Sequence, residues 1–249
     1  TRVQRVERPP AQGRYNVKTP TSVGYGGAVS SVDPEASRVG LQVLRRGGNA
    51  VDAAVAVGYA LAVVYPAAGN LGGGGFMTIQ LADGRKTFLD FRETAPKGAT
   101  ANMYLDKDGN VIAGLSTKGH LAVGVPGSVA GMEYAREKYG TMKRADVIAP
   151  ALQLAEDGFV LDQGDVSMFQ TATKDFEDDP ASAAIFLNNG KPFQVGERLA
   201  QHELAETLPD DDRILAHARD RIEALADRYD HGGVRRFFLL HRARQWNPS

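Results

Sequence analysis

The segment GNLGGGGFMTIQLADGRKTFLDFRETAP, residues 69–96, carries the clearest structural signal in the chain. Its glycine-rich beginning predicts a loop, and the alternation of apolar and polar residues in 76–81 predicts a strand. An Asp-Gly pair then signals a tight turn, after which residues 86–91 predict the returning strand. The segment therefore predicts an antiparallel hairpin that leaves a glycine-rich loop and leads directly to Arg92.

The four glycines at 72–75 could suggest a phosphate-binding loop, but the residues around them disfavour it. A Walker loop ends in Gly-Lys-Ser/Thr, whereas Phe76 and Met77 follow here. A dinucleotide-binding loop opens a helix, whereas this run opens a predicted strand. We therefore expect the glycines to let the backbone approach other backbone or a substrate closely, and we expect no cofactor.

Two helices are predicted before this segment, after strand-like residues at 28–32. The Asp-Pro pair at 33–34 is a typical helix start, because Asp caps free amides and Pro fits the first turn. Glycines at 47–48 end that helix. Asn49 predicts the cap of a second helix over 50–64, which is apolar on nearly every face and is therefore expected to be buried.

Later elements are less sharply marked. A helix is predicted to run through Tyr139 and to end at Gly140, and another is predicted over 149–157. Residues 165–200 are polar and predict no definite element. Beyond them, residues 210–230 show a highly charged helical pattern.

Composition excludes several classes of partner. Lys and Arg number 29 and Asp and Glu number 30, so the net charge of −1 argues against a general nucleic-acid or membrane-surface role. A short basic and aromatic stretch at 235–244 has no nucleic-acid-binding motif around it. The longest apolar run, 53–64, is too short to span a bilayer. We expect neither a nucleic-acid partner nor a membrane span.

Candidates for catalysis and metal binding are weak. The absence of cysteine excludes disulfides, Cys-zinc sites and thiol catalysis. No pair of histidines has zinc-ligand spacing, so we expect no metal. Ser128 lacks a Gly-x-Ser-x-Gly context. An N-terminal Thr can act as a nucleophile, but Thr1 begins a polar arm rather than a core strand. We therefore expect no catalytic residue in this chain. The histidines are His120, His202, His217, His231 and His241.

Arg92 is the candidate binding residue. It follows a predicted strand and lies beside Asp90 and Glu93. A guanidinium can hold a carboxylate through two parallel, charge-assisted hydrogen bonds. The alternative is a solvated surface pair with Asp90 or Glu93, and the residues alone favour that alternative because most charged pairs are solvated.

Several motifs, in order and spacing over about residues 24–205, resemble the γ-glutamyltransferase family. Motifs that agree in register are more specific together than any one of them. They are SVD at 31–33, VLRRGGNAVDAAVA at 43–56, GNLGGGGFM at 69–77, DFRETAP at 90–96, GVPGSVAG at 124–131 and KYGTM at 138–142.

The resemblance implies an α+β fold, the αββα sandwich of N-terminal-nucleophile hydrolases, which would be incomplete in this chain. It implies one exported precursor, periplasmic or secreted, that cleaves itself into a large and a small subunit. The new N-terminal Thr of the small subunit attacks the γ-glutamyl amide of glutathione or a related compound. The γ-glutamyl group then passes to water, an amino acid or a peptide. By position, Arg92 is implied to bind the α-carboxylate of the γ-glutamyl group.

The chain also departs from the family. The small subunit and its nucleophile are absent, so the chain alone is expected to be inactive and to need the small subunit as heterodimer partner. The resemblance stops near residue 208, which suggests a truncated or frameshifted gene or an alternative C-terminus. The alternatives are an inactive remnant with at most a binding or structural role, and a cephalosporin-acylase-like enzyme. We divide the chain into an extended arm at 1–20, a large-subunit portion at 21–208 and a divergent tail at 209–249.

Overall fold

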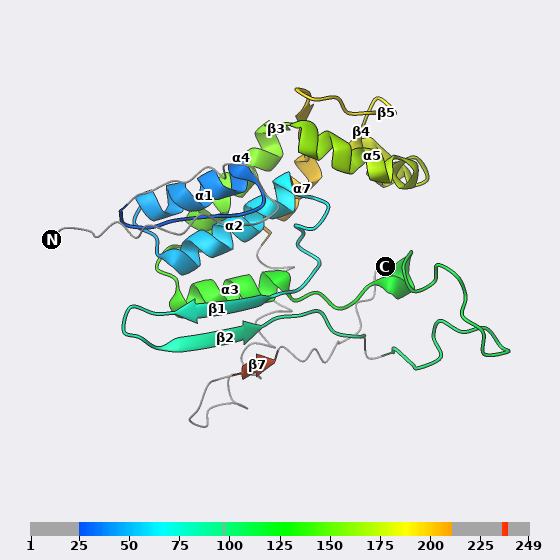
Figure 1. The fold of residues 1–249 in the computed structure, drawn as a ribbon, viewed down its shortest axis with the longest axis horizontal. Coiled ribbons are helices and arrows are strands. Elements are labelled where there is room, and N and C mark those ends of the chain that lie inside the picture. Colours follow the sequence, from blue (N-terminus) through cyan, green and yellow to red (C-terminus); the bar gives the residue numbers. More distant parts are fainter. Residues whose placement is uncertain (1–24, 97, 211–235, 239–249) are drawn as a thin grey trace, which may run out of the picture.

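The computed structural model describes residues 25–96, 98–210 and 236–238 (Figure 1). The arm predicted at 1–20 lies outside these residues, and so does most of the tail predicted at 209–249.

Both predicted N-terminal helices are confirmed. In α1 (Pro34–Arg45), the Asp33 carboxylate accepts a hydrogen bond from the amide of Ala36 at 3.0 Å. In α2 (Ala50–Val64), Asn49 and Asp52 form a reciprocal capping box. The caps satisfy amides that the first turn of a helix leaves without a partner, which explains where each helix begins.

The strand predicted at 28–32 is wrong, because these residues form no strand. The amide of Ser31 donates to the hydroxyl of Ser37 at 3.1 Å, and the hydroxyl of Ser31 donates to the carbonyl of Asp33 at 2.7 Å. The segment thus organises the beginning of α1, and its polar groups are used there rather than in a strand ladder.

The predicted hairpin is confirmed, with each strand one residue shorter than expected. Strand β1 (Phe76–Gln80) pairs antiparallel with β2 (Lys86–Asp90), and β7 (Arg236–Phe238) lies parallel to β2. Ile79 and Leu89 are buried on the inner face. On the outer face Phe76 stacks on Phe88 with ring centroids 5.7 Å apart, yet Phe76 remains 54% exposed.

Helices α3 (Ser128–Tyr139) and α4 (Arg144–Asp157) follow the hairpin. The first ends where predicted, with Gly140 as its C-cap. The second begins five residues before the predicted start at 149 and continues through Pro150. Val147 and Ile148 are buried in this first part of the helix, so their packing outweighs the hydrogen bond that the proline cannot make.

No definite element was predicted for residues 165–200, but the structure shows helices and short strands there. Two N-terminal caps organise this region: the capping box of Asp162 with Asp165, and the cap by Asp179 ahead of Pro180. The elements from residue 159 to residue 207 are β3 (Phe159–Val160), α5 (Gln163–Glu177), α6 (Pro180–Phe186), β4 (Leu187–Asn188), β5 (Lys191–Pro192), β6 (Arg198–Leu199) and α7 (His202–Thr207). Strands β3 and β6 pair with each other, as do β4 and β5.

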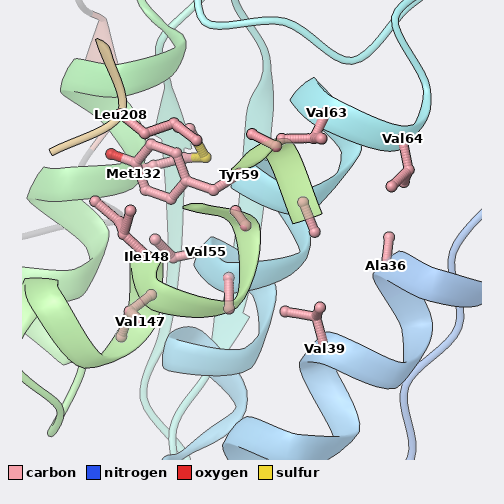
Figure 2. Close-up of a cluster of buried hydrophobic side chains, with 14 of the residues drawn as sticks. Ala36, Val39, Val55, Tyr59, Val63, Val64, Met132, Val147, Ile148 and Leu208 are labelled. Atoms are coloured by element: carbon pink, nitrogen blue, oxygen red, sulfur yellow. The ribbon is translucent and has the colours of Figure 1, made fainter. Parts of the chain in front are cut away.

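The helices cover one face of the hairpin. In Figure 1, α3 lies between the hairpin and the pair formed by α1 and α2. Figure 2 shows side chains from all four N-terminal helices gathered into one buried cluster, in which Tyr59 and Val55 of α2 meet Met132, Ile148 and Leu208. Where two stacked sheets were expected, the described residues contain one three-stranded sheet and two sheets of two-residue strands.

Candidate functional site

Three segments that the sequence singled out meet at the end of β2. They are the glycine-rich loop 69–75, the turn 90–94 that contains Arg92, and the residues that lead into α3. The carbonyl of Gly73 accepts hydrogen bonds from the amides of Gly127 and Ser128, at 2.8 and 2.9 Å. The glycine loop therefore binds the first turn of α3 through backbone groups alone.

The strand end is held from both sides. On one side, the amide of Phe91 donates to the carbonyl of Gly75 at 3.0 Å. On the other, Thr94 and Val125 form a β-bridge, with the amide of Val125 donating to the carbonyl of Thr94 at 2.8 Å. Arg92 lies between these two anchor points, so its backbone has little freedom to move.

The glycines allow close approach, as the sequence predicted. A Cβ atom at Gly74 would overlap the amide of Glu93 and lie 2.8 Å from the carbonyl carbon of Arg92. A Cβ at Gly127 would overlap the carbonyl oxygen of Phe91. Neither glycine has positive φ, so the absent side chain, rather than an unusual backbone conformation, explains the need for glycine.

The side chain of Arg92 is exposed on this rigid backbone, at 63% of its area. Its Nη2 lies 3.7 Å from Oε1 of Glu93, and its backbone amide donates to Oδ1 of Asp90 at 3.1 Å. The surface pairing considered from the sequence is therefore present. An exposed pair of this length contributes at most about 1 kcal/mol, so a ligand carboxylate could compete for the guanidinium.

The other sequence candidates lie elsewhere. Ser128 is the first residue of α3, and its amide serves the backbone contact with Gly73. His202 begins α7, and His120 begins a 3-10 turn (His120–Ala122). Thr1, His217, His231 and His241 lie outside the described residues.

The described residues contain neither a candidate metal-binding group nor a membrane-spanning helix. Across 25–96, 98–210 and 236–238, no three or more His, Asp or Glu residues are grouped so that they could hold a metal ion. Within the same ranges no helix combines the length and the apolar character needed to cross a membrane.

Sequence reasoning missed a buried charged cluster that joins α3 to α2 and α4. Glu133 is 1% exposed and accepts hydrogen bonds from the hydroxyl of Tyr59 at 2.6 Å and from Nε of Arg136 at 2.7 Å. Nε of Arg144 lies 3.2 Å from the same carboxylate. Burial, and then the charge of Glu133, raise the pKa of Tyr59, so its hydroxyl stays protonated and donates. A lone Tyr in an apolar helix was the available signal for a buried polar partner.

A second buried carboxylate fixes the start of α2. Asp52 accepts hydrogen bonds from the amides of Asn49, Thr141 and Met142 and from the hydroxyl of Thr141, at 2.7–3.2 Å. Burial alone would raise the pKa of Asp52, but these hydrogen bonds outweigh it and hold the pKa below its ordinary value. Asp52 thereby ties α2 to the connection between α3 and α4.

A cavity of about 530 Å³ lies elsewhere, among residues 184–200. Its lining includes Glu197, but not Arg92 or the glycine loop. The carboxylate of Glu197 accepts hydrogen bonds from the side chain of Asn188 at 2.9 Å and from the amide of Gln194 at 2.7 Å. The carboxylate of Glu197 is therefore used by the local turn. The convergence of motifs at Arg92 marks the better candidate site.

Comparison with known proteins places the chain in a class and then in a family. The fold matches a crystal structure of Helicobacter pylori gamma-glutamyltranspeptidase with a TM-score of 0.76 and 45% identity, covering 84% of this chain and 61% of that one. The class is therefore that of the N-terminal-nucleophile hydrolase fold.

The sequence model of the family described as Gamma-glutamyltranspeptidase matches residues 36–213, and the chain belongs to this family. The chain is 69% identical over 198 residues to a glutathione hydrolase proenzyme of Pseudomonas sp. (strain A14), which covers 78% of the chain and 34% of that protein. It is 49% identical over 183 residues to the glutathione hydrolase proenzyme of Escherichia coli (strain K12), which covers 73% of the chain and 32% of that protein. It thus spans about a third of the length of these curated relatives.

Proposed function

We propose that this chain is the large-subunit part of a γ-glutamyltransferase or glutathione hydrolase. The enzyme would cleave γ-glutamyl amides such as glutathione and pass the γ-glutamyl group to water, amino acids or peptides. The observation that carries the proposal is Arg92, an exposed guanidinium on a backbone held at both sides. The surrounding motifs, and relatives named as glutathione hydrolases, support it.

In this proposal Arg92 binds the α-carboxylate of the γ-glutamyl group. The planar guanidinium offers two parallel donors to a carboxylate, which fixes the orientation as well as the position of the ligand. The α-carboxylate is remote from the scissile γ-amide, so holding it aligns the reacting carbonyl without touching it. Glu93, at 3.7 Å, would yield its long surface contact to the substrate.

The nucleophile would come from another polypeptide. We propose a heterodimer with a small subunit cut from the same precursor, whose N-terminal Thr attacks the γ-glutamyl carbonyl. The word proenzyme in the names of the relatives supports processing of this kind. A periplasmic or secreted location belongs to the same proposal. So does the assignment of 21–208 to the large subunit, with 209–249 as a divergent tail.

Two alternatives are less well supported. A cephalosporin-acylase-like reaction would use the same fold, but the two relatives described above carry the name glutathione hydrolase at up to 69% identity. Against an inactive remnant, the backbone contacts of Gly73 and Gly74 hold the strand end beside an exposed Arg92, as a substrate-binding residue would require.

The test is release of the aniline from a γ-glutamyl-anilide by the purified chain, alone and with a separately expressed small subunit of the Pseudomonas sp. (strain A14) relative. We expect activity only in the mixture. Activity of the chain alone would contradict a nucleophile on the small subunit, and no activity in a mixture that forms a heterodimer would favour the inactive remnant.

Within the active mixture, Arg92→Lys should raise the KM for the γ-glutamyl donor by about tenfold or more, because Lys keeps the charge but loses the planar fork. Arg85→Lys is the matched control, since Arg85 is an exposed hairpin Arg paired with Asp83 at 2.7 Å. An Arg92→Lys enzyme with the KM of the control would refute the role of Arg92.

A further inference from the structure

We infer that Phe91 is a positioning residue for Arg92. Phe91 lies in a socket of three glycines, Gly75, Gly127 and Gly131, which fixes the direction in which the side chain of Arg92 extends from the backbone. The inference rests on the proposed function, because it takes Arg92 to be the group that binds substrate. The socket combines two regions of the sequence, the glycine loop before β1 and the beginning of α3.

The closest contact with the ring of Phe91 is that of Gly131, inside α3. A Cβ at this position would overlap Cγ and Cδ1 of Phe91 and lie 2.5 Å from its Cβ. Glycine is costly inside a helix compared with alanine, and Gly131 has no positive φ that would require it. Space for Phe91 is therefore the reason for this glycine. Rotating the ring cannot move the Cβ of Phe91, so a side chain at 131 must displace the backbone beside Arg92.

The other two glycines complete the socket. A Cβ at Gly127 would overlap the carbonyl oxygen of Phe91 and lie 2.9 Å from its carbonyl carbon. A Cβ at Gly75 would lie 2.8 Å from Cε2 and 3.2 Å from Cζ at the far end of the ring. Gly75 also accepts the hydrogen bond from the amide of Phe91 at 3.0 Å. The amide of Phe91 is thus hydrogen-bonded, and its ring and carbonyl are closely approached by glycines.

Phe91 is consequently buried, whereas the side chain of its neighbour Arg92 is exposed. Phe91 is 7% exposed, whereas the side chain of Arg92 is 63% exposed. A long Arg side chain has many rotamers, and a firmly oriented Cα reduces the directions that it can explore. Sites work best when the residues that touch the ligand are held by others packed behind them. Phe91 supplies that support without reaching the substrate.

The test is a double-mutant cycle between Phe91→Leu and Arg92→Ala, measured as kcat/KM of the heterodimer for a γ-glutamyl-anilide. Leu keeps the residue apolar but cannot fill the socket. We expect Phe91→Leu to lower kcat/KM by about tenfold when Arg92 is present and by less than about twofold when Arg92 is already Ala. Equal losses in both backgrounds would mean a merely structural role and would overturn the inference.

Two further variants distinguish a loss of positioning from a general loss of stability in Phe91→Leu. Phe169→Leu is the matched control, because Phe169 is 5% exposed and lies on α5; the same loss of volume there should leave kcat/KM unchanged. The three heavy atoms nearest to the Cβ that Gly75→Ala would add are ring carbons of Phe91, Cε2, Cζ and Cδ2, at 2.8–3.7 Å. Gly75→Ala should therefore lower kcat/KM when Phe91 is present but add no further loss to Phe91→Leu, because a leucine side chain lacks Cε2 and Cζ. Equal losses in the two backgrounds would count against the socket.

The result also separates this inference from the proposal beneath it. If Arg92→Ala leaves kcat/KM unchanged, the proposed function of Arg92 fails and the inference fails with it. If Arg92→Ala lowers kcat/KM but the losses from Phe91→Leu are equal in the two backgrounds, Arg92 remains the binding residue and Phe91 is not its positioning residue.

Discussion

Two arginine–carboxylate pairs lie in very different parts of this molecule. At the end of β2, Arg92 lies 3.7 Å from Glu93, and the two side chains are 63% and 39% exposed. Behind α3, Arg144 lies 3.2 Å from Glu133, and the two are 11% and 1% exposed. The first pair lies over a backbone of close glycine contacts, whereas the second is enclosed by helices.

The difference teaches which pair the fold depends on. A buried charge costs several kcal/mol unless it has a partner, so Glu133 and its partners are bound to one another. An exposed pair contributes about 1 kcal/mol or less, so Arg92 can change partner at little cost to stability. Similar chemistry thus serves the fold in one place and remains available to a ligand in the other.

The largest effect should come from Glu133→Gln. The substitution keeps the shape but removes the charge that balances Arg136 and Arg144, and we expect it to lower the free energy of unfolding by about 3 kcal/mol. Urea unfolding at neutral pH is the measurement. Asp175→Asn is the control, because Asp175 pairs with Lys118 where both side chains are more than half exposed, at 61% and 75%. Similar losses in the free energy of unfolding of the two variants would contradict the view that the buried pair stabilises the fold more than an exposed one.

An intermediate effect is expected from Asp52→Asn. The carboxylate accepts from backbone and hydroxyl donors, and an amide would turn an NH₂ group toward some of them. The expected loss is about 2 kcal/mol in the free energy of unfolding near pH 7, since hydrogen bonds to a charged acceptor are the stronger ones.

The same variant should remove part of the pH dependence. The pKa of Asp52 is lower in the folded chain than the ordinary value of about 3.9, so this carboxyl binds fewer protons in the folded chain than in the unfolded one. Its contribution is complete above the unfolded pKa and is lost as the pH falls through the folded pKa. The stability gap between wild type and Asp52→Asn should therefore narrow below about pH 4. A gap that stays constant or widens in urea unfolding at acid pH would contradict the low pKa.

The smallest effect on stability should come from Arg92→Ala. Losing an exposed, long ion pair should change the free energy of unfolding by less than about 1 kcal/mol, even though binding of a γ-glutamyl substrate should suffer. Thermal unfolding of this variant beside Glu133→Gln sharpens the contrast. A loss as large as that of Glu133→Gln would show that Arg92 serves the fold.

Local signals were predictable and distant partners were not. The caps at Asp33 and Asn49 and the Asp-Gly turn each act within a few residues, so the sequence located two helices and the hairpin. Helix α5 was missed although its capping box, Asp162 with Asp165, was equally local. The strand predicted at 28–32 failed because strand pairing depends on a neighbour that the sequence does not specify.

In the candidate site, too, local features could be predicted from the sequence and contacts between distant residues could not. The sequence indicated Arg92, a surface pairing with Asp90 or Glu93, and close packing at the glycines. It did not indicate that Gly131 makes room for Phe91, because the two are brought together only by the packing of α3 on β2. Glu133 and Tyr59 are 74 positions apart, so no local pattern could connect them.

The hydrogen bonds of Asp52 also have a consequence for synthesis on the ribosome. Its partners at Thr141 and Met142 lie 89 and 90 positions further along the chain. At about 5–20 residues per second, α2 emerges on the order of 10 s before the residues that satisfy its carboxylate. During that interval the apolar faces of α2 lack part of their cover, so the nascent chain exposes hydrophobic surface of the kind that favours aggregation until the helical layer can close.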